Sequence, residues 1–346
     1  MQDRPVFDGE SLITSQAVAA DIAARYPSDQ QERPTDAMAE LALVLHTARL
    51  RFEQGKDPVQ TMRWTVDALH KLRRRVAPAI WRELIPVAQH HPVADYFHQD
   101  PFTRWSFEKP RGYSGDAQLL DFIYQHESAL QSAADSTPIG SALYDYSKYY
   151  PSCVAVRERR DNLARMVDQV AAARGGDAEI LAIASGHLRE AEHSVALRSG
   201  QIKRWVALDQ DPMSVGSVAR DFVGTPVDAI DGSVRGLLTD AYKLGTFDFI
   251  YAAGLYDYLT DRVAIRLTRR CMEMLKPGGT MLFANFSPEV TDDGYMETFM
   301  DWTLLLRSEA QMWKIINGTV DRNAVDAEVF FGENRNIVYA TITTPA

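Results

Sequence analysis

The chain has 346 residues, 46% of them hydrophobic, and a formal net charge of −10. This length exceeds one average domain and the apolar content is ample for a core. The acidic balance argues against a general nucleic-acid-binding surface, and no apolar run approaches the roughly 18 residues that a membrane span needs. A small-molecule substrate is therefore the expected partner, with no nucleic acid and no membrane span.

Two features favour a reducing, cytoplasmic compartment. Cys153 and Cys271 are the two cysteines, and they make neither a disulfide framework nor a zinc set. The opening MQDRPVFDGE lacks the basic and apolar regions of a secretory leader. We expect a cytoplasmic protein, and the sequence leaves its oligomeric state open.

Residues 1–130 have helical apolar spacing and contain no strand pattern, which predicts a helical cap or lid. A basic cluster at Lys71–Arg75 ends one of these helices, where it is expected to complement the helix dipole and lie in solvent. Helices are expected at Ala17–Tyr26, at Thr35–Phe52 with Leu41, Leu43, Val44, Leu45 and Leu50 inward, from Pro58 with Met62, Val66, Leu69 and Leu72 inward, and from Pro78 with Ile80, Trp81, Leu84 and Val87 inward.

The stretch Asp100–Asp116, DPFTRWSFEKPRGYSGD, is rich in aromatic residues, proline and glycine. It is interpreted either as a buried loop over a cavity or as a linker whose aromatic rings fill the helical region. Residues 131–176 are expected to form connecting helices that pack on the cofactor site. The longest of these is predicted at Ser152–Ala173.

From residue 177 to 346 the pattern alternates between strand and helix. This predicts an α/β, Rossmann-like, doubly wound and mostly parallel sheet with a C-terminal antiparallel hairpin, preceded by the N-terminal α-helical cap. Helices are expected at 188–197, Pro212–Phe222, Arg262–Leu275, Asp292–Leu304 and Leu306–Ile315. Strands are expected at 179–183, Arg204–Leu208, Pro226–Ile230, Phe247–Tyr251, Thr280–Phe286, Ala327–Phe331 and Ile337–Thr343.

The first strand ends in a small-residue turn, Ala184-Ser185-Gly186, before a helical pattern. Such a turn places backbone N–H groups and the positive end of a helix beside a ligand. Asp209 follows the second strand at an interval suited to ribose hydroxyls, although it could instead cap the next helix. The candidate cofactor-binding residues are Ala184, Ser185, Gly186, Asp209, Gln210, Asp231, Gly232, Ser233, Ala253 and Gly254.

These motifs resemble those of class I S-adenosylmethionine-dependent methyltransferases. The resemblance rests on Glu179–Leu188, Asp209, Asp231-Gly232, FDFIYAAGLYDYL and LKPGG. The segments PRGYSGDAQLLDFIY, AGLYDYLTDRVA and MLFANF more narrowly resemble bacterial 3-hydroxypalmitate methyl ester biosynthesis methyltransferases, which carry a helical N-terminal region. The resemblance implies S-adenosylmethionine as the cofactor.

The first turn departs from that family's pattern of an acidic residue followed by G-x-G-x-G. Those places hold Ala182, Ala184, Gly186 and Leu188. Alanine at 184 still permits close packing, whereas leucine at 188 narrows the turn.

Methyl transfer requires an oriented acceptor, exclusion of water and, for a protonated acceptor, a base. The candidate catalytic residues are Tyr113, Tyr256 and Asp257. Arg111 and Arg307 are candidate carboxylate clamps, Asp116 a candidate amine anchor, and Tyr251 a candidate aromatic contact for the sulfonium. The structural alternatives are packing for the tyrosines, helix capping for the aspartates and ion pairing for the arginines.

A histidine-rich segment is the remaining candidate. A helix would place His91, Asp95 and His98 near one face at the spacing of metal ligands, but Pro92 interrupts the segment and no metal is expected.

Three functions fit these motifs. The first is methyl transfer to a small carboxylate or to a hydroxy or fatty acid. The second is cyclisation of S-adenosylmethionine to azetidine-2-carboxylate and methylthioadenosine, which a related branch of methyltransferase-like enzymes performs and which would place the protein in secondary metabolism. The third is a non-catalytic binding module with the same fold. S-adenosylhomocysteine or methylthioadenosine as product would distinguish the first two.

Overall fold

The computed structural model describes residues 34–346, which divide into two compact units. The helical unit comprises residues 34–154 together with Val290–Thr303. The sheet unit comprises Ala155–Glu289 and Leu304–Ala346. The helix expected at Ala17–Tyr26 lies outside the described residues. None of the helices described is both long and apolar enough to cross a membrane.

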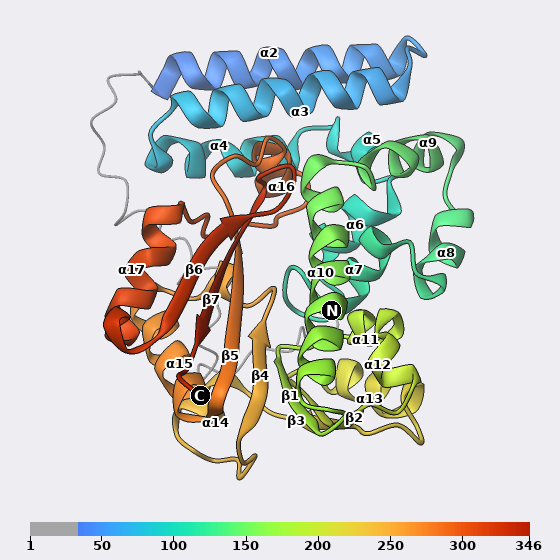
Figure 1. Cartoon of the computed structure of the whole chain (residues 1–346). Helices are drawn as coiled ribbons and strands as arrows, with labels where there is room; N and C mark the ends of the chain where they lie inside the picture. Colours follow the sequence, from blue (N-terminus) through green and yellow to red (C-terminus); the bar gives the residue numbers. More distant parts are fainter. Residues whose placement is uncertain (1–33) are drawn as a thin grey trace. The chain divides into compact units, whose positions relative to one another are not determined.

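The helical unit consists of helices, several of which begin at a capping residue followed by proline (Figure 1). Asp57, Asp100 and Thr137 each cap a helix that has proline at its first position, and their side chains accept from backbone N–H groups. The helices are α2 (Pro34–Glu53), α3 (Pro58–Arg75), α4 (Pro78–His90), α5 (Ala94–Phe97), α6 (Pro101–Glu108), α7 (Ala117–Tyr124), α8 (Glu127–Ala134), α9 (Pro138–Ser147) and α16 (Asp293–Thr298). Helix α10 (Pro151–Ala173) begins in this unit and continues into the sheet unit.

The expected helices at α2, α3 and α4 are confirmed, but three residues expected on their buried faces are exposed. Leu43 and Leu50 of α2 are 67% and 39% exposed, and Val87 of α4 is 37% exposed. Leu43 lies about 200° around the helix from Leu41 and from Leu45, which are buried. One helix face cannot bury all three positions.

The first half of the aromatic stretch after Asp100 is a helix and not a loop, whereas residues 109–116 are irregular. Phe102 is buried and its ring contacts that of Phe122, as the second interpretation expects. Pro101–Glu108 forms α6, because the Asp100 carboxylate accepts from Phe102 N at 3.0 Å and starts the helix. Lys109 ends it in the left-handed conformation. Aromatic density without clear periodicity concealed a two-turn helix.

Helix α16 joins the helical unit although it follows β5 in the chain. Gly294 makes this packing possible, because a Cβ there would lie 2.7 Å from the backbone of Leu69 in α3. Arg73 of α3 donates to Asp293 at 2.8 Å and to Glu297 at 2.7 and 2.9 Å. The basic cluster that ends α3 is therefore not wholly solvated as expected. One of its arginines, Arg73, is paired with two buried acids.

The sheet unit contains a seven-stranded sheet in the order β3-β2-β1-β4-β5-β7-β6 (Figure 1). Strands β1 to β5 pair in parallel, and β7 is antiparallel to both β5 and β6. The strands are β1 (Ala178–Ile183), β2 (Ile202–Asp209), β3 (Val227–Asp231), β4 (Phe247–Ala252), β5 (Leu275–Phe286), β6 (Asp326–Phe331) and β7 (Ile337–Thr343). The expected doubly wound sheet with a C-terminal antiparallel hairpin is confirmed.

Residues alternate between the two faces of the sheet, as strand geometry requires. Leu181, Val206 and Ile250 belong to a core that includes side chains from α14, α15 and α17. Their neighbours Trp205 and Tyr251 belong to the other face, where their rings lie 6.5 Å apart. The helices of this unit are α11 (Arg189–His193), α12 (Val195–Arg198), α13 (Pro212–Asp221), α14 (Val234–Leu238), α15 (Asp261–Glu273) and α17 (Glu309–Thr319), with 3-10 turns η1 (Tyr256–Tyr258) and η2 (Arg322–Ala324).

Three expected elements differ. The helix predicted at Asp292–Leu304 ends at Thr298 as α16, and residues 301–308 form no helix. The helix predicted at 188–197 is two short helices, because Ser194 stops α11 and its hydroxyl caps α12 by accepting from Leu197 N. LKPGG does not precede the fifth strand but lies within β5, where the pairing with β4 shifts between Phe247 and Phe249. Leu275–Gly279 thus forms an irregular start to β5.

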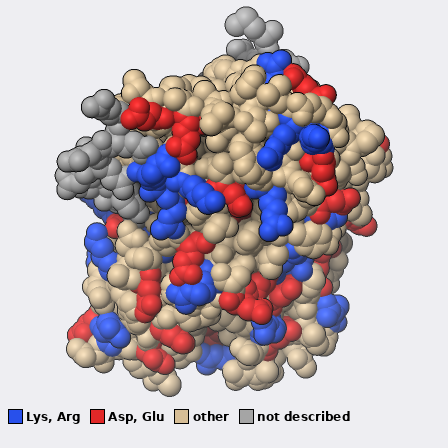
Figure 2. Space-filling model, turned by 90° about the horizontal axis from the view of Figure 1, so that it is seen from above, with Lys and Arg blue, Asp and Glu red and all other residues tan. Residues whose placement is uncertain are grey.

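The charges on one face of the molecule are mixed. Figure 2 shows lysine and arginine side chains lying beside aspartate and glutamate side chains on this face. Such interspersed charges differ from the continuous basic stripe of a nucleic-acid surface.

Candidate functional site

The sheet has a topological switch point between β1 and β4. The chain proceeds from β1 outward to β2 and β3, then returns to β4 on the other side of β1. Ligands of doubly wound sheets bind outside the carboxyl ends of the strands at such a point. The segments that follow β1, β2 and β4 are therefore the candidate site.

In the turn after β1, every second residue has a left-handed backbone conformation. Ala184, Gly186 and Leu188 have φ angles of 53°, 54° and 53°. Glycine adopts this left-handed conformation readily, whereas alanine and leucine do so at a cost. These are the three places at which the resembled family has glycine. Strain of this kind concentrates at functional sites.

Asp209 holds this turn against the ends of β2 and β3. Its carboxylate accepts from Gly186 N at 2.7 Å and from Asp211 N at 2.9 Å, and its carbonyl accepts from Gly232 N at 2.8 Å. Burial raises the pKa of Asp209, and the two backbone bonds partly offset that rise. Each carboxylate oxygen can accept a second hydrogen bond, so the position remains suited to ribose hydroxyls.

The alternative role for Asp209, capping the next helix, belongs to its neighbour. Asp211 accepts from Met213 N at 3.0 Å and from the Ser214 hydroxyl at 2.8 Å, and so caps α13. Gln210 lies half-buried between the two aspartates.

Of the three candidate residues at the end of β3, one is exposed and two contact the surrounding structure. Asp231 is exposed. Gly232 is buried, and a Cβ there would lie 3.0 Å from the Leu208 side chain. Ser233 caps α14, accepting from Gly236 N at 3.1 Å, while its own N–H donates to the Tyr242 hydroxyl. Only Asp231 of these three presents its side chain outward.

A tyrosine and a glutamate meet near the end of β4. The Tyr251 hydroxyl donates to Glu190 of α11 at 2.5 Å. Both side chains are buried, and burial raises the pKa of Glu190, partly offset by this hydrogen bond and by the positive charge of Arg159. The sequence pattern identified Tyr251 but gave no sign of Glu190, which looked like an ordinary helix residue.

Arg159 is the second residue that the sequence did not single out. It comes from α10, is 3% exposed, and donates from Nη1 to Ala253 O at 2.8 Å. Within the described part of the chain this is its only hydrogen bond, which leaves most of its five N–H donors unused. A Cβ at Gly254 would lie 3.7 Å from Nη2, so Gly254 borders the guanidinium. Three arginines stand close together on α10, and spacing alone does not show which is buried.

Asp257 lies in η1, just after β4, and is 2% exposed. Its Oδ1 accepts from Phe286 N at 2.7 Å. Burial raises the pKa of Asp257 to about 7, despite the opposing charges of Arg159 and Arg307. A carboxyl group that titrates near neutrality suits a general base.

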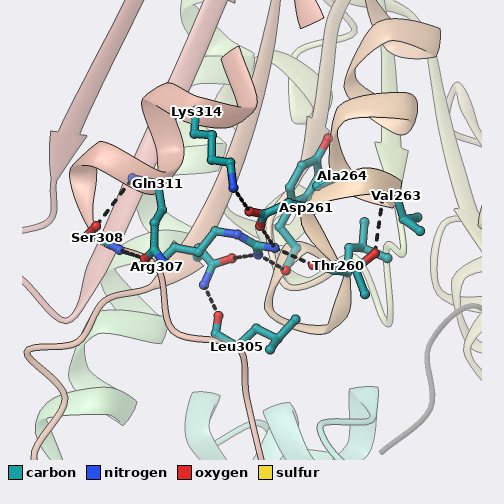
Figure 3. Close-up of polar contacts among 12 residues, drawn as sticks. Thr260, Asp261, Val263, Ala264, Leu305, Arg307, Ser308, Gln311 and Lys314 are labelled. Atoms are coloured by element: carbon teal, nitrogen blue, oxygen red, sulfur yellow. Dashed lines mark hydrogen bonds and ion pairs between the residues drawn. The ribbon is translucent and has the colours of Figure 1, made fainter. Parts of the chain in front are cut away.

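Arg307 is fully buried and serves as a brace (Figure 3). Its guanidinium donates to the carbonyls of Tyr256 and Leu259, to Asn285 Oδ1 at 2.6 Å and to Asp261 at 3.2 Å. These bonds hold η1, and with it Asp257, against β5. They favour a structural role over the expected carboxylate clamp.

Tyr256 also belongs to the framework. Its ring is fully buried and stacks on Phe283 at 4.5 Å, and its hydroxyl bonds to Thr268 at 2.7 Å. Burial raises the pKa of Tyr256 well above its ordinary value. This setting favours packing over the expected catalytic role.

Three expected site residues lie in the helical unit. Asp116 accepts from Leu119 N at 2.8 Å and so caps α7, and Trp105 Nε1 donates to both of its oxygens. Capping was the structural alternative considered for it. Arg111 and Tyr113 are half-buried in the segment before α7.

The histidine-rich segment has other partners. His98 Nε2 bonds to Phe299 O at 2.9 Å, and His91 Nδ1 accepts from Val93 N at 3.2 Å. Among residues 34–346 no group of three or more His, Cys, Asp or Glu side chains is arranged to hold a metal ion.

Comparison with known proteins supports the fold alone. The chain matches no protein-family model and no curated protein. A solved structure of a possible exported protein from Bordetella parapertussis is 17% identical, covers 90% of this chain and 97% of its own, and gives a TM-score of 0.53.

Two further solved structures are similar to about two thirds of this chain, with TM-scores below 0.5. A candidate methyltransferase from Thermobifida fusca is 17% identical over 66% of this chain and 94% of its own, with a TM-score of 0.49. The N-methyltransferase NodS from Bradyrhizobium japonicum, solved with S-adenosylhomocysteine, is 19% identical over 65% of this chain and all of its own, with a TM-score of 0.40. The class of protein that emerges is a Rossmann-like α/β protein with the strand order described above.

Proposed function

We propose that the sheet unit binds S-adenosylmethionine and transfers its methyl group to a small-molecule acceptor. The observation that carries the proposal is the turn after β1, where three successive glycine-type positions keep the left-handed conformation and Asp209 anchors the middle one. Asp209 and Asp231 would contact the ribose and adenine. Arg159 would hold the methionine carboxylate with the donors that Ala253 does not use.

Asp257 is proposed as the base that receives the acceptor's proton. In methyl transfer the acceptor atom bonds to the methyl carbon as the bond from that carbon to the sulfonium sulfur breaks. A hydroxyl or amine acceptor must also lose a proton, and a neighbouring carboxylate can receive it. For a carboxylate acceptor, which carries no proton, Asp257 would have no such task. A hydroxyl-bearing or amine acceptor therefore fits Asp257 better than a simple carboxylate. Arg307, the candidate arginine of the sheet unit for holding an acceptor carboxylate, is already bonded to the carbonyls of Tyr256 and Leu259.

Incubation with S-adenosylmethionine tests the reaction. The purified chain should release S-adenosylhomocysteine when a pool of small hydroxyl- and amine-bearing metabolites is present, and little product when it is absent. Mass spectrometry of the products is the measurement. Methylthioadenosine and azetidine-2-carboxylate without any acceptor would replace methyl transfer by cyclisation. Thermal stabilisation by S-adenosylhomocysteine with no turnover would indicate a binding module.

Asp209→Asn should weaken S-adenosylhomocysteine binding about tenfold, since one carboxylate acceptor becomes an N–H₂ donor facing a backbone N–H or a ribose hydroxyl. Calorimetry measures the affinity. Asp228→Asn, an exposed position on β3, is the matched control and should leave it unchanged. Equal affinities in the two variants would remove Asp209 from the site.

The rate should depend on pH through Asp257. The base form is the carboxylate, so kcat should rise as the pH rises through about 7 and level off above it. The pKa of Asp257 is about 7 in the folded protein and 3.8 in the unfolded chain, so the unfolded chain loses this proton first as the pH rises. Between these two pH values the contribution of Asp257 to the free energy of unfolding therefore falls as the pH rises. Asp257→Asn should remove most of the rate and the pH dependence of the remainder; a pH profile unchanged in that variant would contradict the assignment.

A further inference from the structure

Two buried polar atoms of the helical unit lack a hydrogen-bond partner among the described residues. They are Tyr150 Oη and Asp292 Oδ1. Tyr150 is 3% exposed and Asp292 is 1% exposed. Leaving a buried polar atom unpaired costs about as much as the desolvation of the group, so native proteins give nearly all such atoms a partner. Both atoms thus call for a partner that the surrounding side chains do not supply.

The two atoms belong to one cluster. Ser152, two residues after Tyr150, donates its hydroxyl hydrogen to the other carboxylate oxygen of Asp292. The Tyr150 ring makes edge contacts with the rings of Tyr146 and Tyr295, at 5.3 and 6.1 Å between centroids. Burial is the main cause that raises the pKa of Tyr150, and the Asp292 charge adds to it. The end of α9, the start of α10 and the start of α16 therefore bring a carboxylate, a phenol and two further aromatic rings together.

Burial raises the pKa of Asp292 to about 6, an effect partly offset by the hydrogen bond from Ser152 and by the charge of His70. Among the described residues Asp292 forms no ion pair, in contrast to its neighbours on α16. Asp293 pairs with His70 at 2.7 Å and with Arg73 at 2.8 Å, and Glu297 pairs with Arg73. Asp292 has no cation within ion-pair distance in the part of the chain that the structure describes. A buried carboxylate without a cation is costly, which favours a positively charged partner.

Asp100, the other buried carboxylate near Tyr150, differs from Asp292 because both of its oxygens accept hydrogen bonds. Its oxygens accept from Phe102 N at 3.0 Å, from the Thr103 hydroxyl at 2.7 Å and from the Ser147 hydroxyl at 2.9 Å. It needs no further donor. Within the described residues of the helical unit, Asp292 and Tyr150 are the two that keep a buried side-chain atom without a hydrogen-bond partner.

We propose that the helical unit binds a primary ammonium group between Asp292 Oδ1 and Tyr150 Oη. An ammonium carries three N–H donors and a positive charge, so it satisfies both atoms and balances the carboxylate. A neutral alcohol would leave the charge unbalanced, and an anion would add to it. This inference rests on the helical unit alone and goes beyond the proposed function of the sheet unit.

Methylammonium chloride is the probe, added to the full chain while thermal unfolding is followed. The wild type should be stabilised in a saturating manner by methylammonium and not by equal concentrations of sodium chloride or tetramethylammonium chloride, since tetramethylammonium has no N–H donor. Asp292→Asn should abolish the saturating effect. Tyr150→Phe should weaken it about tenfold or more, because it removes a hydrogen bond to a charged group.

Asp301→Asn is the matched control. It removes the same charge from the same chain segment outside the cluster, where Asp301 pairs with Lys109 and has a φ of 46° that asparagine tolerates. It should bind methylammonium as the wild type does. If Asp292→Asn fails to fold, Tyr150→Phe decides, since it removes only the unpaired hydroxyl.

Two results would overturn the proposal. One is a wild type that responds to methylammonium no differently from sodium chloride, as expected if a water molecule pairs with both atoms. The other is a Tyr150→Phe variant that binds methylammonium with unchanged affinity. S-adenosylhomocysteine binding, measured in the same variants, reports on the sheet unit and distinguishes failure of this proposal from failure of the proposed function.

Discussion

Arg307→Met is expected to lower the free energy of unfolding by roughly 3–5 kcal/mol, the range found when one partner of a buried charged network is removed. Methionine fills much of the volume but donates no hydrogen bond. The carbonyls of Tyr256 and Leu259 and the amide oxygen of Asn285 would then lose a donor in a buried setting (Figure 3). Urea denaturation followed by circular dichroism measures the change.

Lys314→Met is the control for Arg307→Met. Lys314 pairs with the same acid, Asp261, at 3.0 Å, but its side chain is 67% exposed. Exposed pairs contribute about 0–1 kcal/mol, so this variant should unfold close to the wild type. Similar losses in the two variants would mean that the common ion pair with Asp261, rather than the buried carbonyl contacts, is what Arg307 contributes.

Arg159→Leu is expected to weaken S-adenosylhomocysteine binding about 100-fold, the effect of losing a charge-assisted, two-point contact with a carboxylate. Methylthioadenosine lacks that carboxylate, so its affinity should change by less than about threefold. Calorimetry with both ligands gives the comparison. Arg159→Lys should recover part of the loss, because lysine restores the charge but not the planar fork.

Arg165→Leu is the matched control on the same helix, since Arg165 is exposed. It should bind both ligands as the wild type does. Equal losses for the two ligands in Arg159→Leu would show that the arginine acts through Ala253 and the end of β4, to which it is bonded at 2.8 Å, and not on the carboxylate.

The sequence by itself determined the sheet. Buried strands of β-branched and apolar residues alternate with helices, and several helix starts carry a local signal, as Asp57-Pro58 does for α3. The hairpin of β6 and β7 was also predictable, because polar turn residues separate two strands of alternating pattern. These features are local, and a local pattern is enough to define them. Even the departure at Ala184 and Leu188 was visible as residue types in glycine positions.

Tertiary structure alone decided which side chains carry charge in the interior. Four arginines lie on α10, yet only packing places Arg159 against Ala253. By residue type Arg307 fits a substrate clamp, but its guanidinium donates to the backbone carbonyls of Tyr256 and Leu259. Asp292 sits in a segment that follows β5 but folds with the helical unit. Burial and partner choice depend on contacts between residues distant in sequence, and one-dimensional periodicity does not encode those contacts.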